Sequence, residues 1–289
     1  MTEQAECIVH IPKILYYWRN HAASTASNVS AKPYTMVSGK KALQEHLQRI
    51  GLRGTVMDSS VPTTYRISYE LDEKPLVSVV IRGDKKEQTE ASVRKVSTYD
   101  HFEIASMEDA QGEYIVCLEG GTEIITPDWI EQLLMFGQRS DVGAVGGLMY
   151  DENDLVYHAG QVIGSDASVY AAHRGVQRGS EGYKFRLTLA QNYTAVSDAC
   201  MMVRKRVWDE IGGIDEKLTV YAGADFCLRM RERGYLVVWT PYAEFRCCRQ
   251  QDDHVARKSF GDKWYGKVDS DPSYNAELDR SGHGFAVKI

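Results

Sequence analysis

Apolar and polar positions along the chain follow the pattern of an α/β domain. The apolar runs at 76–81, 113–118 and 142–149 are typical of strands buried on both faces of a parallel sheet. Shorter strands are predicted at 102–105 and 236–239, and helices at 87–96, 126–139, 204–211 and 225–233. This alternation predicts a mainly parallel sheet flanked by helices.

Several helix ends carry local signals. Thr126 is predicted as the N-cap of the helix that follows it, with Pro127 at its first position and Asp128 favoured by the helix dipole. Gly212-Gly213 is a C-cap signal for the helix at 204–211, and Gly234 ends the helix that contains Asp225.

Composition excludes some classes of function. The 289 residues carry 34 basic and 40 acidic side chains, so the net charge of −6 gives no basic field for nucleic acid. No apolar run reaches the roughly 20 residues that span a bilayer, and we expect a cytoplasmic protein, with peripheral attachment to the inner membrane face as the alternative. The six cysteines show no spacing typical of zinc ligands.

The segment Tyr221–Tyr235, which includes Asp225-Phe226-Cys227-Leu228-Arg229, is the most informative motif. It occurs in order with other blocks: 112–118, 122–129, 141–146, 157–160, 191–196, 199–204, 212–216 and 271–275. Together these blocks resemble family 2 glycosyltransferases of the GT-A fold over about residues 75–289. The resemblance implies an inverting transfer from a nucleotide sugar, with a catalytic base and a Mg²⁺ or Mn²⁺ ion.

The same resemblance implies that key positions have changed. Gly223 stands at the family's base position, and Gly121 at its main metal-ligand position. A metal-side histidine is expected near 246–248, where the sequence is Arg-Cys-Cys. No metal ligands are therefore predicted, and Mn²⁺ or Mg²⁺ is expected only if the protein is active. The remaining candidates are Asp225 and Asp198 for catalysis, and Asp109, Glu119, Gln191, Asn192 and Tyr193 for nucleotide or substrate binding.

These candidates also have ordinary structural interpretations. Asp225 suits the first turn of a helix, Asp198 a cap or loop hydrogen bond, and Asp109 an exposed turn. For Glu119-Gly120-Gly121, a solvent-facing turn after a strand is the favoured interpretation. His158 and His173 are interpreted as loop or core histidines.

The interval between Val77 and Gly121 is short for the family that the chain resembles. It leaves little room for the segment that closes over base and ribose, so we expect a shortened nucleotide-binding half. Arg82-Gly83-Asp84 also replaces the loop that usually follows the first strand.

Residues 1–74 are predicted to be an N-terminal extension, and 75–289 the GT-A-like domain. The segment 8–19 parallels 237–246, since both contain an apolar strand, a proline and a second apolar-aromatic strand. This resembles the junction inside tandem bacterial polysaccharide glycosyltransferases, with 38–50 as a linker helix. A hairpin and helix packed on the main domain is the alternative.

Three functional hypotheses follow. The first is a degenerate or truncated family member, a pseudoenzyme of bacterial surface polysaccharide or glycan biosynthesis. It would bind a glycan, a neighbouring transferase domain or a second copy. The second is an active inverting glycosyltransferase with relocated carboxylates. The third is a scaffold or dimerisation domain. Residues at the site decide between them, since one fold supports many functions.

Overall fold

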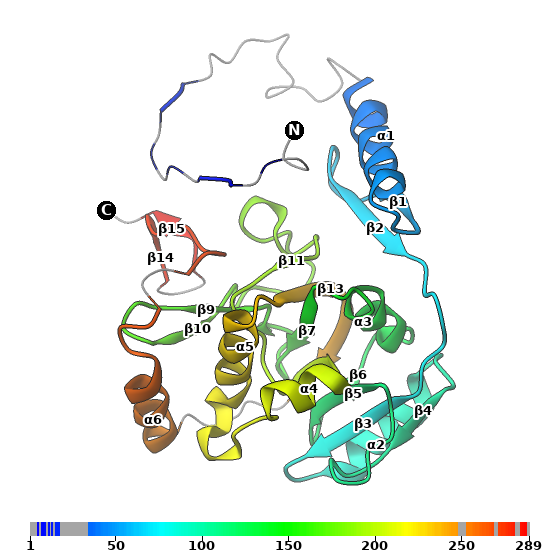
Figure 1. Ribbon diagram of the computed structural model, residues 1–289, viewed down its shortest axis with the longest axis vertical. Helices are drawn as coiled ribbons and strands as arrows, with labels where there is room; N and C mark the ends of the chain where they lie inside the picture. The colour runs from blue at the N-terminus through cyan, green and yellow to red at the C-terminus, as the bar shows by residue number, and fades with distance from the viewer. Residues whose placement is uncertain are drawn as a thin grey trace.

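A mixed β-sheet forms the centre of the molecule (Figure 1). The computed structural model describes residues 5, 7–9, 11, 13, 15–17, 34–247, 253–268, 271–280 and 284–287. Within them the strand order is β11-β13-β7-β12-β5-β3-β4, with β6 beside β13 and β8 beside β7. The strands are β3 (Val77–Arg82), β4 (Phe102–Ile104), β5 (Tyr114–Glu119), β6 (Glu123–Ile124), β7 (Val142–Tyr150), β8 (Val156–His158), β11 (Gln191–Asn192), β12 (Cys200–Arg204) and β13 (Leu236–Arg246).

Most of the long strands run in one direction. β3 is parallel to β4 and β5, and β13 is parallel to β7. β12 lies between β5 and β7 and is antiparallel to both, so β7 points the same way as β5. The predicted mainly parallel sheet is confirmed, and the antiparallel strand β12 is an addition that the sequence pattern did not predict.

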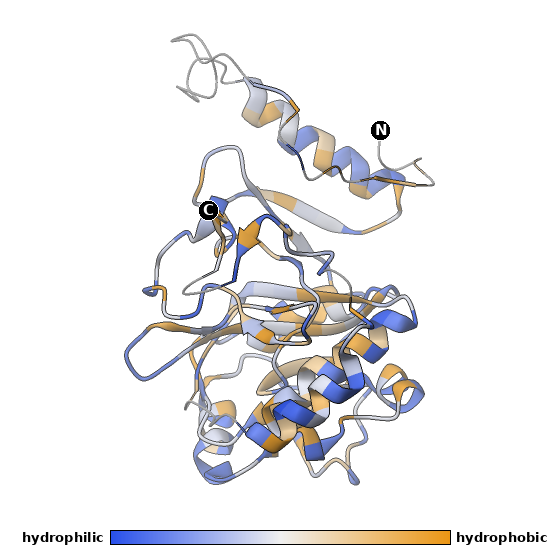
Figure 2. Cartoon of the chain, turned by 90° about the vertical axis from the view of Figure 1, so that its left-hand side faces the viewer, coloured by the Kyte–Doolittle hydropathy of each residue, from blue (hydrophilic) through white to orange (hydrophobic). Residues whose placement is uncertain are grey.

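Helices cover both faces of this sheet (Figure 1). In β5, Val116 and Leu118 pack in the cluster that contains α2 and α3 residues, whereas Ile115 and Cys117 lie on the opposite face near Trp208 of α4. This period of two is the reason that β5 is apolar throughout. Figure 2 shows that hydrophilic and hydrophobic residues alternate along the helical ribbons. The helices are α2 (Lys86–Val96), α3 (Trp129–Gly137), α4 (Lys205–Ile211), α5 (Ala222–Glu232) and α6 (His254–Trp264).

The predicted helix ends are correct in part. Gly212 is the C-cap of α4 with φ 86°, as its C-cap signal predicts. Thr126 as an N-cap was wrong: Asp128 is the N-cap of α3, and the hydroxyl of Thr126 accepts the backbone N–H of Glu244 instead. α5 begins at Ala222, so Asp225 lies in its first turn.

The connection between β4 and β5 is unusually short. These parallel strands lie on opposite sides of β3 and are joined by residues 105–113 alone, without a helix. Parallel strands normally need a crossover of about a dozen residues or more. The hydroxyl of Ser78 accepts the N–H of Gly112 and donates to Glu103, which ties both ends of this loop to β3.

An N-terminal unit of α1 (Tyr34–Arg49), β1 (Gly54–Asp58) and β2 (Tyr65–Tyr69) lies at one end of the molecule (Figure 1). It contacts α3: Arg66 donates to Gln132 at 2.8 Å, and the rings of Tyr69 and Phe136 meet edge to face. The helix predicted at 38–50 is thus present, starting at Tyr34. A domain boundary at 74/75 stays a prediction.

The predicted strand-proline-strand segment at 8–19 lies partly outside the described residues, and those described there belong to no strand. Two small sheets complete the fold: β9 (Gln161–Ile163) with β10 (Val169–Ala171), and β14 (Leu278–Asp279) with β15 (Ala286–Val287). None of the helices in the described part of the chain has the length and apolar character needed to cross a bilayer.

Candidate functional site

The candidate site lies where β3 and β5 end side by side, with Arg82 paired to Glu119. The loops that follow these strands pack directly on each other. The N–H of Gly120 donates to the carbonyl of Arg82 at 2.7 Å, and a Cβ at Gly120 would lie 1.7 Å from the carbonyl oxygen of Asp84. A Cβ at Gly83 would lie 2.5 Å from Oε1 of Glu119. Only glycines allow this close approach.

Asp198 forms an ion pair with Arg82 at the same edge. Nη2 of Arg82 donates to Oδ2 of Asp198 at 2.5 Å and to its backbone carbonyl at 2.9 Å. Burial acts to lower the pKa of Arg82, but the carboxylate of Asp198 outweighs it and leaves that pKa above its ordinary value. The side chain of Asp198 is 4% exposed, and its Oδ1 has no hydrogen-bond partner among the described residues.

Gly223 faces Asp198 at close range. A Cβ at Gly223 would lie 2.5 Å from the backbone nitrogen of Asp198 and 2.9 Å from its Oδ1. The carboxyl group of Asp198 therefore occupies the room that a side chain at position 223 would need. These two residues, predicted separately from the sequence, meet in space.

Asp225 is engaged in the packing of α5 against α6. Its fully buried carboxylate accepts the Nε–H of Arg229 at 2.8 Å and the indole N–H of Trp264 at 2.9 Å, and it pairs with Lys263. Every donor comes from α5 or α6, so this carboxylate holds the two helices together.

The other candidates are dispersed. Asp109 is exposed and accepts the hydroxyl of Ser106 at 2.6 Å. Gln191 and Asn192 form β11, which three strands, β13, β7 and β12, separate from β5. At the usual strand spacing this is about 19 Å. Tyr193 is fully buried, with its ring edge to face with that of Trp239. The structure therefore does not bring Gln191, Asn192 or Tyr193 to Glu119.

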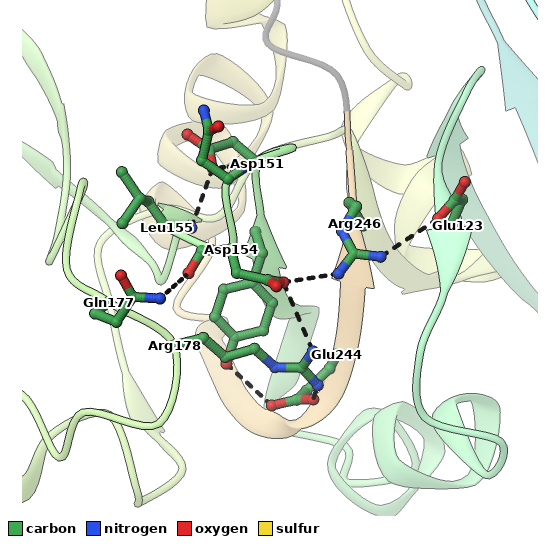
Figure 3. A network of polar contacts seen from close by, with 10 residues as sticks. Glu123, Asp151, Asp154, Leu155, Gln177, Arg178, Glu244 and Arg246 are labelled. Atoms are coloured by element: carbon green, nitrogen blue, oxygen red, sulfur yellow. Dashed lines mark hydrogen bonds and ion pairs between the residues drawn. The ribbon is translucent and has the colours of Figure 1, made fainter.

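Ion pairs fill the end of β13, where the resemblance places a metal-side histidine (Figure 3). Arg246 donates to Asp154 at 2.7 Å and pairs with Glu123 at 3.5 Å. Arg178 donates to Glu244 at 2.7 Å, and the same carboxylate accepts the hydroxyl of Tyr150 at 3.0 Å. The hydrogen bond to Asp154 is the main reason that the pKa of Arg246 is raised.

The residues at this edge do not fit a divalent ion. Guanidinium groups neutralise its carboxylates, and Gly121 has no side chain to offer. Among the described residues, no group of three or more histidine, cysteine or acidic side chains is placed to hold a metal. No step of a reaction is therefore assigned to a metal here.

Sequence reasoning did not identify Arg82 as the partner of Asp198. The two residues are 116 positions apart in the sequence, so no local spacing predicts the ion pair. The sequence also contains no sign of a cavity between β2 and the sheet, which is lined in part by Gln191 and Asn192.

Two curated proteins are similar to this chain. The uncharacterized protein y4gI of Sinorhizobium fredii is 30% identical over 97% of the chain and 38% of its own length. The O-antigen biosynthesis protein RfbC of Myxococcus xanthus is 27% identical over 83% of the chain and 22% of its own length. The chain thus spans well under half the length of either relative. No family model matches the sequence.

Two solved structures are also similar to the chain. GalNAc-T7 with UDP, GalNAc and Mn²⁺ is 12% identical, with a TM-score of 0.48 over 68% of this chain and 48% of that one. The mannosyltransferase PcManGT of Pyrobaculum calidifontis, in complex with GDP-Man and Mn²⁺, is 10% identical, with a TM-score of 0.40 over 80% of this chain and 71% of that one.

Proposed function

We propose that this protein is a glycosyltransferase-like, family 2 component of surface polysaccharide biosynthesis that does not itself catalyse sugar transfer. It acts by binding a glycan or a partner transferase. A relative named as an O-antigen biosynthesis protein supports the biosynthetic setting. The resemblance of the sequence blocks supports the family.

The proposal rests on the carboxyl ends of β3 and β5, where the loops that follow the two strands pack on each other. We call these strand ends the closed edge of the sheet. A nucleotide sugar needs an open cleft beyond the strand ends, a metal or cationic group at the diphosphate, and a base beside the acceptor. Here Gly120 rests against the loop of Asp84, Arg82 is paired with Asp198, and Asp198 fills the space beside Gly223. None of these requirements is met here, because each of the groups concerned is engaged in a contact within the protein.

The short connection from β4 to β5 supports the same conclusion. The alignment with y4gI extends over 341 positions. Because 97% of 289 residues is about 280, some 61 of these positions hold no residue of this chain. The relative is therefore longer within the matched region.

Calorimetric titration with UDP-, GDP- and dTDP-sugars, each with and without Mn²⁺, tests the proposal. We expect no heat of binding at micromolar concentrations and no released nucleotide. Micromolar binding accompanied by turnover would refute it. Asp198→Asn and the exposed Asp209→Asn serve as site variant and matched control in the turnover assay.

One observation favours an active enzyme as the second candidate. Oδ1 of Asp198 is buried, has no hydrogen-bond partner within the described part of the chain, and lies 2.9 Å from the ideal Cβ position of Gly223, where it would stand in for a carboxylate at that position. A general base must reach the acceptor hydroxyl, however, and this oxygen is enclosed by protein. If the enzyme is active in this way, Asp198→Asn abolishes turnover and Asp209→Asn does not.

A further inference from the structure

A cavity of about 200 Å³ lies between the N-terminal unit and the edge of the sheet. β2 contributes Tyr65, Ile67 and Tyr69, which are alternate residues and therefore share one face of the strand. The opposite wall comes from the ends of α3 and β11 and from β13. Its volume is below the roughly 300–1,000 Å³ of sites for drug-sized ligands, so it suits one small ring system.

Aromatic side chains that are fixed by other contacts line this cavity. The hydroxyl of Tyr65 donates to the carbonyl of Met36 in α1 at 2.7 Å. The hydroxyl of Tyr242 donates to the carbonyl of Thr188 at 2.9 Å, and Arg66 lies 3.8 Å from the centre of its ring. Rings held in this way lose little entropy when a ligand packs against them.

Two amide side chains supply polar groups beside these rings. Nε2 of Gln191 donates to the carbonyls of Arg186 and Leu189, which fixes the amide and turns its Oε1 away from them. The side chain of Asn192 is exposed at the cavity. Gln191 therefore offers its Oε1 as an acceptor, whereas the amide of Asn192 offers donors and an acceptor, and these are the partners that hydroxyl groups require.

The cavity offers little net charge. Among the described residues that line it, Arg139 alone is charged, and it donates to both carboxylate oxygens of Asp141, at 3.0 and 2.7 Å. The resulting bidentate pair is already satisfied, so it does not provide a site for a phosphate or carboxylate.

The cavity lies away from the closed edge described above. Arg204 donates to the carbonyls of Gly137 and Gln138 at the end of α3, and its side chain also reaches Tyr114, the first residue of β5. α3 therefore ends at the amino edge of β5, whereas Glu119 lies at its carboxyl edge. Phe136 and Arg139 place the cavity beside this end of α3.

We propose that this cavity binds one uncharged sugar unit of a glycan. The pyranose C–H groups would pack on the tyrosine rings, and its hydroxyls would bond to the amides of Gln191 and Asn192. Such a site lets a protein without transferase activity hold a polysaccharide.

Saturation-transfer NMR of the full chain with methyl glycosides of glucose, galactose, mannose, rhamnose and N-acetylglucosamine, each at about 10 mM, tests this site, since single-ring ligands bind at millimolar Kd. We expect binding of at least one glycoside. Asn192→Trp, which fills the cavity from an exposed position, should weaken it at least tenfold. Asn192→Ala should weaken it about threefold to tenfold, because one polar contact is lost.

The matched control is Asn153→Trp, which adds the same ring at an exposed asparagine outside the cavity and should bind like the unmodified protein. The proposal is overturned if no glycoside binds, if both variants at Asn192 bind normally, or if uridine binds there and no glycoside does. Turnover that is lost in Asp198→Asn would refute the proposed lack of catalysis and leave this site intact, so the two failures are distinguishable.

Discussion

Replacement of Asp225 by alanine tests whether this carboxylate is structural. Removing it leaves the indole N–H of the buried Trp264 without an acceptor, at a cost of about 1–3 kcal/mol. Arg229 loses a charge-assisted bond but keeps its bonds to the carbonyls of Ile211 and Gly213. Lys263 is 39% exposed and contributes little because solvent screens it. The total destabilisation expected for Asp225→Ala is about 3–5 kcal/mol.

Urea unfolding followed by circular dichroism measures this loss in the free energy of unfolding. In thermal unfolding, the melting temperature should fall by about 5–10 °C. The control is Asp209→Ala, which removes a 58% exposed carboxylate that pairs with Lys205 one helical turn away. That change should cost less than about 0.5 kcal/mol.

A free energy of unfolding for Asp225→Ala within about 0.5 kcal/mol of the control would refute the structural role. A residue kept for catalysis behaves in the opposite way, because its removal leaves stability unchanged or raises it while activity is lost.

Three further predictions concern stability. Gly223→Ala should lower the free energy of unfolding by about 1–3 kcal/mol, because its Cβ would meet the backbone of Asp198. Gly261→Ala, in open space within α6, should raise it by about 0.5–1 kcal/mol in the same urea assay. Equal effects of the two changes would contradict the close contact at Gly223. Burial raises the pKa of Cys117 and Cys227 each to about 12, while thiols of the unfolded chain ionise near pH ~8.5. Only the unfolded state then loses protons as the pH rises, so stability should fall by about 1.4 kcal/mol per thiol per pH unit above that value, and an unchanged urea midpoint between pH 8 and 10 would exclude this. Burial, and to a smaller extent the charge of Arg174, lowers the pKa of His158 to about 3. Below pH ~6.5 only the unfolded state gains this proton, so the free energy of unfolding falls toward pH ~3. The free energy of unfolding of His158→Gln should decline less steeply in acid than that of the unmodified protein.

The elements that could be predicted from sequence are those with strong local patterns. β3, β5 and β7 are near-continuous apolar runs, and Gly212 ends α4 with the backbone conformation that glycine favours. β12 is equally apolar, but no local pattern reveals that it enters the sheet antiparallel between two other strands. The β1–β2 hairpin escaped prediction because its strands are short and only partly buried.

The candidate site shows the same limit. The glycines at positions 121 and 223 could be read directly from the sequence. Which carboxylate lies beside Gly223 could not be predicted, because Asp198, Arg82 and Gly223 come from distant segments. Asp225 illustrates the converse: its motif predicts a functional residue, and only tertiary contacts reveal its bonds to α6.

The contact between Gly223 and Asp198 has a consequence for any attempt to introduce a carboxylate at this position. A side chain placed at position 223 alone is disfavoured, because its Cβ would lie 2.5 Å from the backbone nitrogen of Asp198. Shrinking Asp198 first would strip Arg82 of its ion-pair partner, and leaving a buried charge unpaired costs several kcal/mol. Replacing Arg82 first would strand the carboxylate in the same way. Every order of substitution therefore passes through a destabilised intermediate, so that residues 82, 198 and 223 constrain one another through their packing.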